Sequence, residues 1–299
     1  MSIEQDLGPK LQHGIKKDEP MSAHTSWMVG GPADYFLSPA DLTELVEIVR
    51  YSGRNRLPLY ILGNGTNLLV LDGGIRGLVV HLGPPFSYTE PDRSSLRAGA
   101  GTPMSVLANG AAEAGLTGLE FAIGIPGSLG GALIMNAGAF GGYIGERVQT
   151  VKLIDFYGRV ETISGGEITF GYRSSSLVGQ GVIVEACLAL EKEDPEKILK
   201  TMEKYSAERR SRHPSLPSAG SVFRNPPDRP AGKIIEEAGA KGMRIGGAEV
   251  SAKHANFIVN TGEATAADIL ALIKAVRELV KDKYGLDLQP EVRIVGEES

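Results

Sequence analysis

The chain has 299 residues, 42% hydrophobic and 22% charged, a balance typical of globular proteins rather than disordered or fibrous ones. Its 31 Lys and Arg against 36 Asp and Glu give a net charge of −5, which argues against nucleic-acid binding. The single cysteine, Cys187, excludes intrachain disulfides and cysteine-based metal sites and favours a reducing cytoplasm. The scattered histidines suggest no metal site either.

The first half of the chain predicts alternating helices and strands. Residues 1–20 form a charged extension without the apolar run of a secretory signal. Ser38 is predicted to cap a helix of about a dozen residues that begins at Pro39. Strands are predicted at 58–62, 67–71, 77–82, 95–99 and 182–190, a helix at 102–114, and a hairpin at 148–156 and 159–163.

One segment is long enough to cross a bilayer but has the wrong content. Residues 121–145 carry no charge, yet glycines, Pro126 and Asn136 recur through them. Such residues would break a membrane helix repeatedly, whereas they suit a buried turn beside a ligand. We therefore expect no membrane insertion.

A domain boundary is predicted near Glu191, where a polar stretch leads into a helix capped by Asp194. Beyond it we expect a short helix at 232–239, a strand at 254–260 and a helix at 265–284 with Thr265 and Asp268 as its capping box and Gly285 closing it. The fold class is therefore mixed α and β. No repeat of 20–50 residues is visible, which excludes solenoids and propellers.

Two glycine-rich loops are candidate ligand sites. Residues 63–67 lie between predicted strands and form either an anion-binding nest or a tight hairpin. Residues 124–131 indicate either close backbone approach to a ligand or a structural turn. Neither loop matches the dinucleotide fingerprint, and the chain has no phosphate loop and no serine-hydrolase elbow.

Three polar segments also stand out. Arg173 follows a glycine and a tyrosine, and is either functional or a surface arginine. Ser221 heads a strand-like piece with Asn225 after it, and a turn serine is the alternative. By the period of two, Glu291 and Arg293 share one face of a predicted terminal strand at 290–295, or they belong to an ordinary paired surface strand. Spacing alone cannot bring these segments into one site.

Together the segments resemble the family of UDP-N-acetylenolpyruvoylglucosamine reductases (MurB). The resemblance covers nearly the whole chain in seven ordered blocks, at 24–36, 62–70, 118–141, 171–175, 218–227, 231–262 and 290–296. It implies an α+β fold with an FAD-binding domain of the vanillyl-alcohol-oxidase (PCMH) type at 21–191, in subdomains of about 21–85 and 86–191. A smaller α+β substrate-binding domain follows at 192–299, with a C-terminal strand that returns to the active site.

The resemblance also implies a cofactor and its ligands. FAD would bind noncovalently, although the sequence does not exclude a covalent link to His24 or Cys187, and NADPH would be the co-substrate. The residues that match the family's cofactor-binding positions are Leu62, Gly63, Asn64, Gly65, Thr66, Asn67, Gly124, Ile125, Pro126, Gly127, Ser128, Gly131 and Ala132.

By the same resemblance, Arg173, Ser221 and Glu291 are the catalytic residues. Arg173 can meet a carboxylate with two parallel donors, Ser221 matches the proton donor, and Glu291 either holds the enol oxygen or orients Arg173. Substrate contacts are expected from three further residues, Asn225, Arg224 and Arg293.

The chain resembles the shorter branch of the family, which lacks an inserted loop whose tyrosine closes over the substrate diphosphate. Tyr205 is the only tyrosine between Arg173 and Ser221. Diphosphate recognition is expected instead from a cluster at 209–213, which contains Arg209, Arg210, Arg212 and His213. The alternative is that this cluster is a solvated helix end. His213 replaces an expected glutamine.

The implied activity is NADPH-dependent, FAD-mediated reduction of UDP-N-acetylglucosamine enolpyruvate to UDP-N-acetylmuramate in peptidoglycan precursor synthesis, in the cytoplasm. Two alternatives are an FAD oxidase of the same fold, which would pass electrons to oxygen, and a flavin-binding module without turnover. Fast reoxidation of the reduced flavin by air would indicate the oxidase, and flavin binding without turnover would indicate the binding module.

Overall fold

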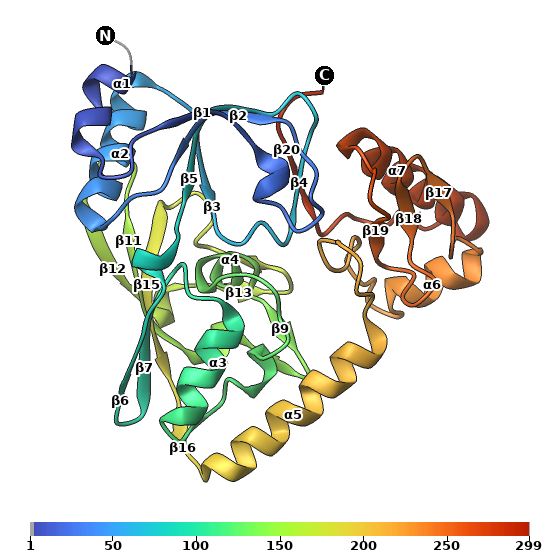
Figure 1. The fold of residues 1–299 in the computed structure, drawn as a ribbon. Helices are drawn as coiled ribbons and strands as arrows, with labels where there is room; N and C mark the ends of the chain where they lie inside the picture. The colour runs from blue at the N-terminus through green and yellow to red at the C-terminus, as the bar shows by residue number, and fades with distance from the viewer. Residues whose placement is uncertain (1–2, 299) are drawn as a thin grey trace. The chain divides into compact units, whose positions relative to one another are not determined.

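The computed structural model describes residues 3–298 and confirms a mixed α and β fold (Figure 1). Contacts divide the chain into two compact units, each built from separate stretches. Unit 1 comprises 1–17, 35–64 and 77–209, and unit 2 comprises 18–34, 65–76 and 210–299. The chain therefore passes from unit 1 to unit 2 after Arg209, rather than near Glu191 as predicted, and two early stretches belong to unit 2.

A four-stranded sheet has the order β1-β2-β5-β3. Its strands are β1 (Lys16–Pro20), β2 (Pro32–Leu37), β5 (Ile75–His81) and β3 (Leu59–Leu62), and β3 pairs with β5 in parallel. Helix α2 (Leu42–Asn55) contributes Leu45, Ile48 and Val49 to the core that also holds Leu78 and Val80 of β5. A short helix, α1 (Ile3–Asp6), precedes the sheet.

A five-stranded antiparallel sheet occupies the rest of unit 1, in the order β12-β11-β15-β7-β6. Its strands are β12 (Val160–Ser164), β11 (Val148–Ile154), β15 (Val182–Ala189), β7 (Ser95–Gly99) and β6 (Thr89–Asp92). The predicted hairpin around Tyr157-Gly158 is confirmed as β11–β12. The two sheets therefore fall within residues 16–81 and 89–189.

Helices and small hairpins complete unit 1. The helices are α3 (Met104–Glu113), which contacts β6, α4 (Leu129–Met135) and α5 (Pro195–Arg212), whose last three residues belong to unit 2. The small pairs are β8 (Leu116–Thr117) with β16 (Glu191–Lys192), β9 (Gly138–Ala139) with β10 (Gly142–Tyr143), and β13 (Phe170–Gly171) with β14 (Ser174–Ser175). Short 3-10 helices lie at Gly8–Lys10, Met21–Ala23, Pro84–Phe86, Glu120–Ala122, Ile144–Arg147 and Gly165–Glu167.

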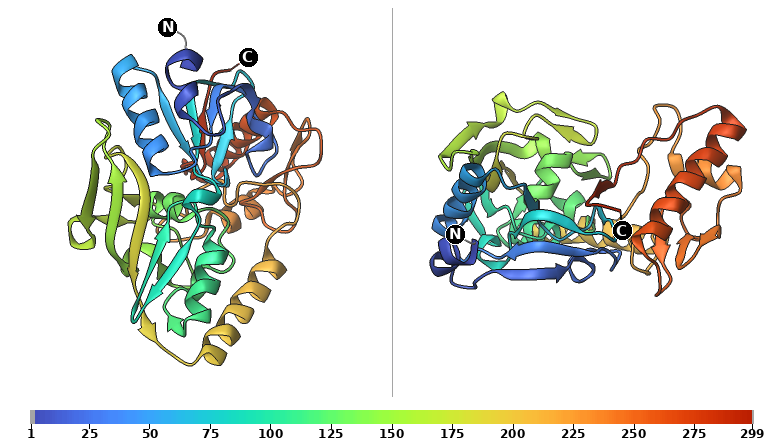
Figure 2. Two further views of the ribbon diagram at one scale, coloured as in Figure 1. Left: turned by 60° about the vertical axis from the view of Figure 1, so that its left-hand side comes forward. Right: turned by 90° about the horizontal axis from the view of Figure 1, so that it is seen from above.

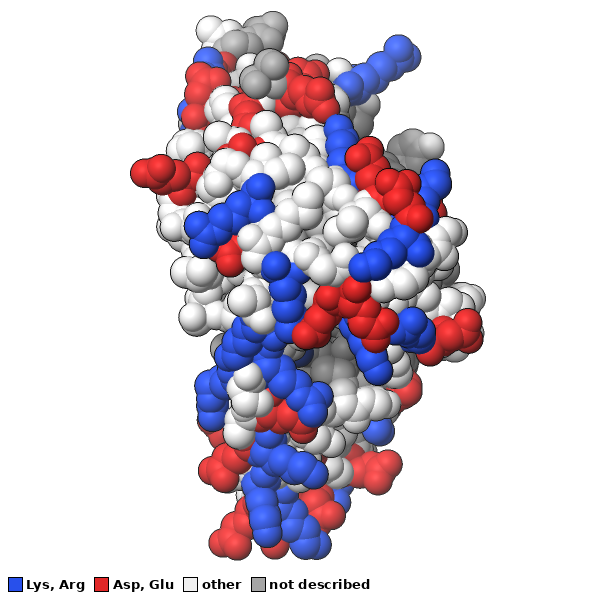
Figure 3. All heavy atoms as spheres, turned by 90° about the vertical axis from the view of Figure 1, so that its right-hand side faces the viewer, with Lys and Arg blue, Asp and Glu red and all other residues white. Residues whose placement is uncertain are grey.

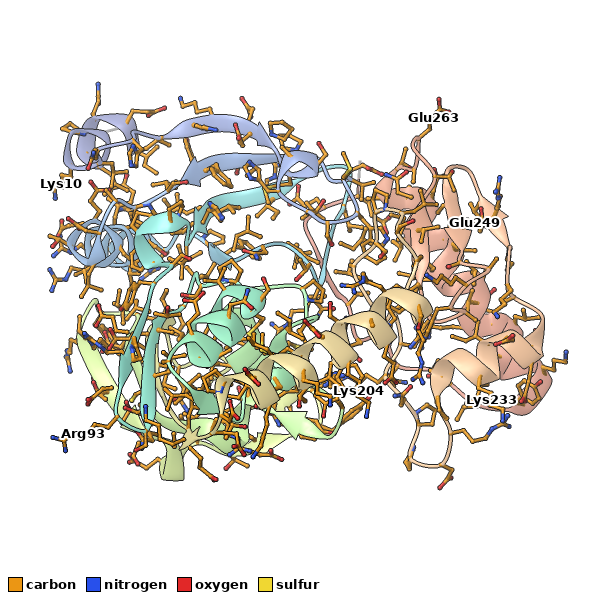
Figure 4. The ribbon with its side chains drawn as sticks, turned by 60° about the horizontal axis from the view of Figure 1, so that its bottom comes forward. Lys10, Arg93, Lys204, Lys233, Glu249 and Glu263 are labelled. Carbon is orange, nitrogen blue, oxygen red and sulfur yellow. The ribbon has the colours of Figure 1, made fainter. Side chains whose placement is uncertain are left out.

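Helix α5 is long and uninterrupted (Figure 2). Asp194 caps it as predicted, since its carboxylate accepts the N–H of Glu196 at 3.0 Å. Only Ile198 and Met202 of this helix are buried. Lys and Arg side chains, interspersed with Asp and Glu, gather where α5 lies in Figure 3, and Lys204 points away from the helix in Figure 4. Most of α5 is therefore a charged, exposed surface.

Unit 2 contains a three-stranded sheet with two helices and a separate strand pair. The sheet consists of β17 (Arg244–Ile245), β18 (Ala248–Val250) and β19 (Ile258–Asn260), the helices are α6 (Ala231–Ala238) and α7 (Ala266–Tyr284), and β4 (Leu68–Val70) pairs in parallel with β20 (Arg293–Val295). Trp27 and Leu69 from the early stretches are fully buried with Ile273 and Val276 of α7. Lys233, Glu249 and Glu263 point outward from this unit (Figure 4).

Local signals predicted one helix closely and another less well. Thr265, Asp268 and Gly285 cap α7 as predicted. The cap of α2 is Asp41 rather than Ser38, because the Asp41 carboxylate accepts the N–H of Glu44 at 2.9 Å. The strand predicted at 254–260 is confined to 258–260, and the strand predicted at 290–295 is confined to 293–295. Glu291 thus precedes β20, and the period of two does not relate it to Arg293.

Within residues 3–298, no helix is both long and apolar enough to cross a membrane.

Candidate active site

The two glycine-rich loops meet inside unit 1. A β-carbon built on Gly63 would lie 2.2 Å from the hydroxyl oxygen of Ser128, so a side chain at Gly63 would displace that hydroxyl. Gly127 has φ +121°, a conformation that favours glycine. The hairpin alternative for residues 63–67 is wrong, because β3 and β4 lie in different sheets. The loops therefore form a narrow glycine-lined contact between Gly63 and the start of α4.

Several backbone groups of the second loop are already used. The N–H groups of Leu129 and Gly130 donate to Thr102 and Ala100 at 2.9 and 2.8 Å, which fixes the start of α4. Ala132 donates to Ser128 at 2.9 Å, and Ile125 to Ala122 at 3.0 Å. Ile125 and Ala132 are therefore not backbone donors to a ligand and can contribute only as walls.

The remainder of the first loop belongs to unit 2. Gly65 has φ +59°, a conformation that favours glycine. It also packs closely against the 24–26 segment, since an added β-carbon would lie 2.0 Å from the carbonyl oxygen of His24. The Gly65 carbonyl accepts the N–H of Ser26 at 3.1 Å. This packing explains the glycine at position 65 by close approach of the 24–26 segment.

Asn67, Glu291 and the Ser221 segment come together in unit 2. The N–H of Glu291 donates to Val222 at 2.7 Å, and the Glu291 carbonyl accepts the Asn67 side-chain amide at 3.2 Å. The Asn67 carbonyl also accepts the N–H of Arg293 at 3.0 Å. Both backbone groups of Glu291 are therefore fixed, one by the residue after Ser221 and the other by a predicted cofactor-binding residue.

Arg173 occupies the tip of a two-residue turn in unit 1. Tyr172 and Arg173 connect β13 to β14, and Arg173 has φ +53°, a left-handed conformation that costs a non-glycine residue roughly 1 kcal/mol or more. Its guanidinium carbon lies 5.1 Å from the centre of the Tyr172 ring. Backbone strain at a tip that presents an arginine points to a functional role for the side chain.

Arg209 lies beside Gly124 and Arg173 in unit 1. A β-carbon on Gly124 would lie 2.4 Å from Cδ of Arg209, so the glycine makes room for the arginine stem. Burial, and then the charge of Arg173, lowers the pKa of Arg209 to about 10. The guanidinium remains charged at neutral pH. Two guanidinium groups whose charges interact, both on half-buried residues, create a positive spot suited to an anion.

The three predicted substrate contacts sit in unit 2 with different local roles. The Asn225 side-chain oxygen accepts the N–H of Ala231 at 2.9 Å, at the start of α6, and the N–H of Arg224 donates to Gln289 at 2.9 Å. The side chains of Arg224 and Arg293 are exposed. Asn225 thus has a structural contact that the sequence did not reveal.

Two aromatic groupings were not predicted. In unit 1, Phe140 and Tyr205 stack with ring centres 4.1 Å apart and planes 2° from parallel. In unit 2, His213 and His254 each lie 4.8 Å from the centre of the Phe257 ring.

The described chain thus assembles the predicted residues in two groups. Gly63, Ser128, Gly124, Arg173 and Arg209 lie in unit 1, and Asn67, Ser221 and Glu291 in unit 2. Over residues 3–298, no cluster of three His, Cys, Asp or Glu side chains is arranged to hold a metal ion.

Comparison with known proteins defines the class first. Residues 33–164 match the model of an FAD binding domain, and residues 212–295 match that of the UDP-N-acetylenolpyruvoylglucosamine reductase C-terminal domain. The protein is therefore an α+β flavoenzyme with an FAD-binding domain of the PCMH type.

Full-length relatives define the family. The chain is 51% identical to the UDP-N-acetylenolpyruvoylglucosamine reductase of Heliobacterium modesticaldum, over 94% of this chain and 90% of that protein. It is 48% identical to that of Moorella thermoacetica, over 97% and 98%. A crystal structure of the Thermus caldophilus enzyme matches with a TM-score of 0.81 and 37% identity, over 92% of this chain and 97% of that one. The chain belongs to the UDP-N-acetylenolpyruvoylglucosamine reductase family, a family of FAD-dependent oxidoreductases.

Proposed function

We propose that the protein catalyses NADPH-dependent reduction of UDP-N-acetylglucosamine enolpyruvate to UDP-N-acetylmuramate, in peptidoglycan precursor synthesis. The substrate is supported by relatives 51% and 48% identical over nearly the whole chain, which are UDP-N-acetylenolpyruvoylglucosamine reductases. The observation that carries the proposal is the fixed placement of Glu291 next to the Ser221 segment, through the 2.7 Å hydrogen bond to Val222. NADPH as the reductant and the cytoplasmic location stay predictions.

The family resemblance assigns the two glycine-rich loops to the proposed cofactor. The loops turn at Gly65 and Gly127 in conformations that favour glycine, and the missing side chains at Gly63 and Gly124 let Ser128 and Arg209 pack against the main chain there. In this proposal residues 62–67, 124–128 and 131–132 hold FAD noncovalently, with Ile125 and Ala132 as walls. When bound, FAD carries the hydride from NADPH to the terminal vinyl carbon of the substrate.

The protein's own residues act on the charge that this hydride creates. A negative charge develops on the carbon that bears the carboxylate and on the carboxylate oxygens. The Arg173 guanidinium, with its parallel donors, stabilises this enolate, and Glu291 holds or orients the same groups. The Ser221 O–H bond breaks as a C–H bond forms at that carbon, and Ser221 then recovers a proton from solvent.

Arg209 and Arg173 together provide the positive charge that the shorter family branch needs for an anionic substrate. The substrate carries a diphosphate and a carboxylate, and Arg209 is the half-buried arginine among the predicted diphosphate ligands. We assign Arg209 to the diphosphate, whereas Arg210 and Arg212 are exposed. His213 packs on Phe257, so its contact with substrate is not supported.

One experiment tests the proposed function. The purified protein is mixed anaerobically with NADPH, and then with the enolpyruvyl sugar nucleotide, while the flavin spectrum is followed. Bleaching by NADPH, rapid recovery of colour on addition of the substrate, and UDP-N-acetylmuramate in the product mixture are expected. Recovery of colour by air alone, at the same rate as with substrate, would instead identify an oxidase, and an unreactive flavin would identify a binding module.

A further inference from the structure

The segment that carries Ser221 is hydrogen-bonded to a single buried asparagine, Asn256. Asn256 is 3% exposed and lies in the turn that precedes β19. Its side-chain oxygen accepts the N–H of Phe223 at 2.9 Å, and its side-chain nitrogen donates to the Phe223 carbonyl at 2.8 Å. One amide group therefore satisfies both backbone groups of the same residue.

The backbone of Asn256 adds a third bond to this segment. Its carbonyl accepts the N–H of Val222 at 2.8 Å. At Val222 the hydrogen bond is between two main chains. At Phe223 the side chain of Asn256 replaces the main chain as the partner, because residues 255 and 256 form a turn rather than a strand. Val222 and Phe223 are buried, so their backbone groups need these partners.

The other side of the same segment faces the residues around Glu291. The Val222 carbonyl accepts the N–H of Glu291 at 2.7 Å, and Phe223 forms a bridge with Pro290. Asn256 and Glu291 therefore clamp residues 222 and 223 from two sides. Ser221, which follows the left-handed Gly220 (φ +75°), emerges directly from this clamp.

We propose that Asn256 is a positioning residue that fixes the Ser221 hydroxyl for proton delivery to the substrate. This inference rests on the proposed function. The amide is required because it is a donor at one end and an acceptor at the other. An ionised aspartate has acceptors only, and one of them would face the Phe223 carbonyl oxygen.

The chain offers a matched control in Asn260, four residues further on. Asn260 is 5% exposed, donates to the Trp27 carbonyl at 2.9 Å and accepts the N–H of Gly262 at 2.8 Å. It is as buried and as fully hydrogen-bonded as Asn256, but its side chain does not contact residues 221–223. A purely structural role would therefore make the two asparagines equivalent.

The test uses Asn256→Ser, Asn256→Asp, Asn260→Ser and Ser221→Ala in the FAD-loaded protein, with the two half-reactions measured separately. For Asn256→Ser we expect reoxidation by the enolpyruvyl substrate to slow by roughly 10- to 100-fold, the cost of a misplaced reacting group, with an unchanged substrate KM and unchanged flavin reduction by NADPH. Asn256→Asp should slow the same step further. Asn260→Ser should lower the melting temperature without changing the ratio of the two rates.

The double variant gives the decisive comparison. In a Ser221→Ala background, Asn256→Ser should change the substrate step less than about twofold, because the group that it positions is gone. Equal slowing in both backgrounds would overturn the proposal, as would equal slowing of both half-reactions or failure of Asn256→Ser to fold. If Ser221→Ala itself left the substrate step intact, the proposed role of Ser221 would fail instead.

Discussion

A methyl group on Gly63 would place its carbon 2.2 Å from the hydroxyl oxygen of Ser128, at the contact between the two loops assigned to FAD. Gly63→Ala should therefore displace the Ser128 hydroxyl and lower the FAD content, with a small loss of stability because that hydroxyl can rotate. The ratio of flavin to protein absorbance and the melting temperature measure the effect.

Relief of the overlap provides the control. Ser128→Gly removes both side-chain atoms that the new methyl group would meet, at 2.2 and 3.2 Å. The double variant should regain FAD content relative to Gly63→Ala alone. If Gly63→Ala binds FAD like the parent protein, the loop contact is not part of the cofactor site.

Arg173 has opposite effects on stability and on activity. Its left-handed φ of +53° suits glycine, so Arg173→Gly should stabilise the fold by about 1 kcal/mol. The same change removes the guanidinium proposed to stabilise the enolate, and should slow the substrate step by roughly 10²- to 10³-fold. Denaturant unfolding and flavin reoxidation measure the two effects, and Arg173→Ala, which keeps the backbone strain, is the comparison. Full activity in Arg173→Gly would remove this residue from the mechanism.

Ser221 is assigned to one half-reaction only. Ser221→Ala should leave flavin reduction by NADPH nearly unchanged and slow substrate reduction by roughly 10²- to 10⁴-fold, the range of a general acid. Stopped-flow measurement of the two phases checks this. Ser218→Ala, three residues earlier in the chain, is the control and should leave both phases unchanged. Equal slowing of both phases by Ser221→Ala would contradict the assignment.

Arg209 should matter for substrate affinity. Loss of a hydrogen bond to a charged group costs about 1.5–3 kcal/mol, so Arg209→Ala should raise the KM for the sugar nucleotide roughly 10- to 100-fold. Lys204→Ala, on the exposed part of the same helix (Figure 4), removes a positive charge elsewhere and should have little effect. A similar rise in KM for both variants would indicate long-range attraction rather than a binding site.

His254 should make stability depend on pH. Burial lowers the pKa of His254, and its Nδ1 accepts the N–H of Asn256 at 3.2 Å, so the ring is neutral in the fold. An unfolded histidine titrates near 6.5, so below about pH 6.5 the unfolded chain binds the proton that the folded chain resists. Stability from this group is complete above that pH and is lost as the pH falls. His254→Asn should show a flatter decline between pH 7.5 and 5 in unfolding experiments, and parallel curves would contradict this.

Much of the local structure was readable from the sequence because it depends on neighbouring residues. The α7 capping box and its closing glycine are short-range signals, and so is the β11–β12 hairpin. The parallel pairing of β4 with β20 joins residues more than 200 positions apart, and no local pattern encodes it. The cap of α2 was misplaced because two capping residues, Ser38 and Asp41, competed within one turn.

The site was predictable as a set of residues but not as a set of contacts. The resemblance identified Ser221, Glu291 and Asn67, whereas the hydrogen bonds that join their segments connect residues far apart in the chain, mostly through backbone groups that leave no pattern in the sequence. The stem of Arg209 beside Gly124 was equally hidden, because a glycine that makes room for a distant side chain looks like a flexible turn in sequence. The amide clamp at Phe223 requires the three-dimensional turn before β19.

Unit 2 is built from three separate stretches of the chain, which restricts when it can fold during synthesis and which fragments of it can fold alone. Its core joins Trp27 and Leu69 to α7, and its last strand pairs with β4. During synthesis on the ribosome, residues 18–34 and 65–76 therefore cannot complete the fold of unit 2 until residues 293–295 have been made. A fragment cut at the family boundary, 212–295, would leave the Ile258 carbonyl without the Trp27 indole and β20 without its neighbour, and should not fold by itself.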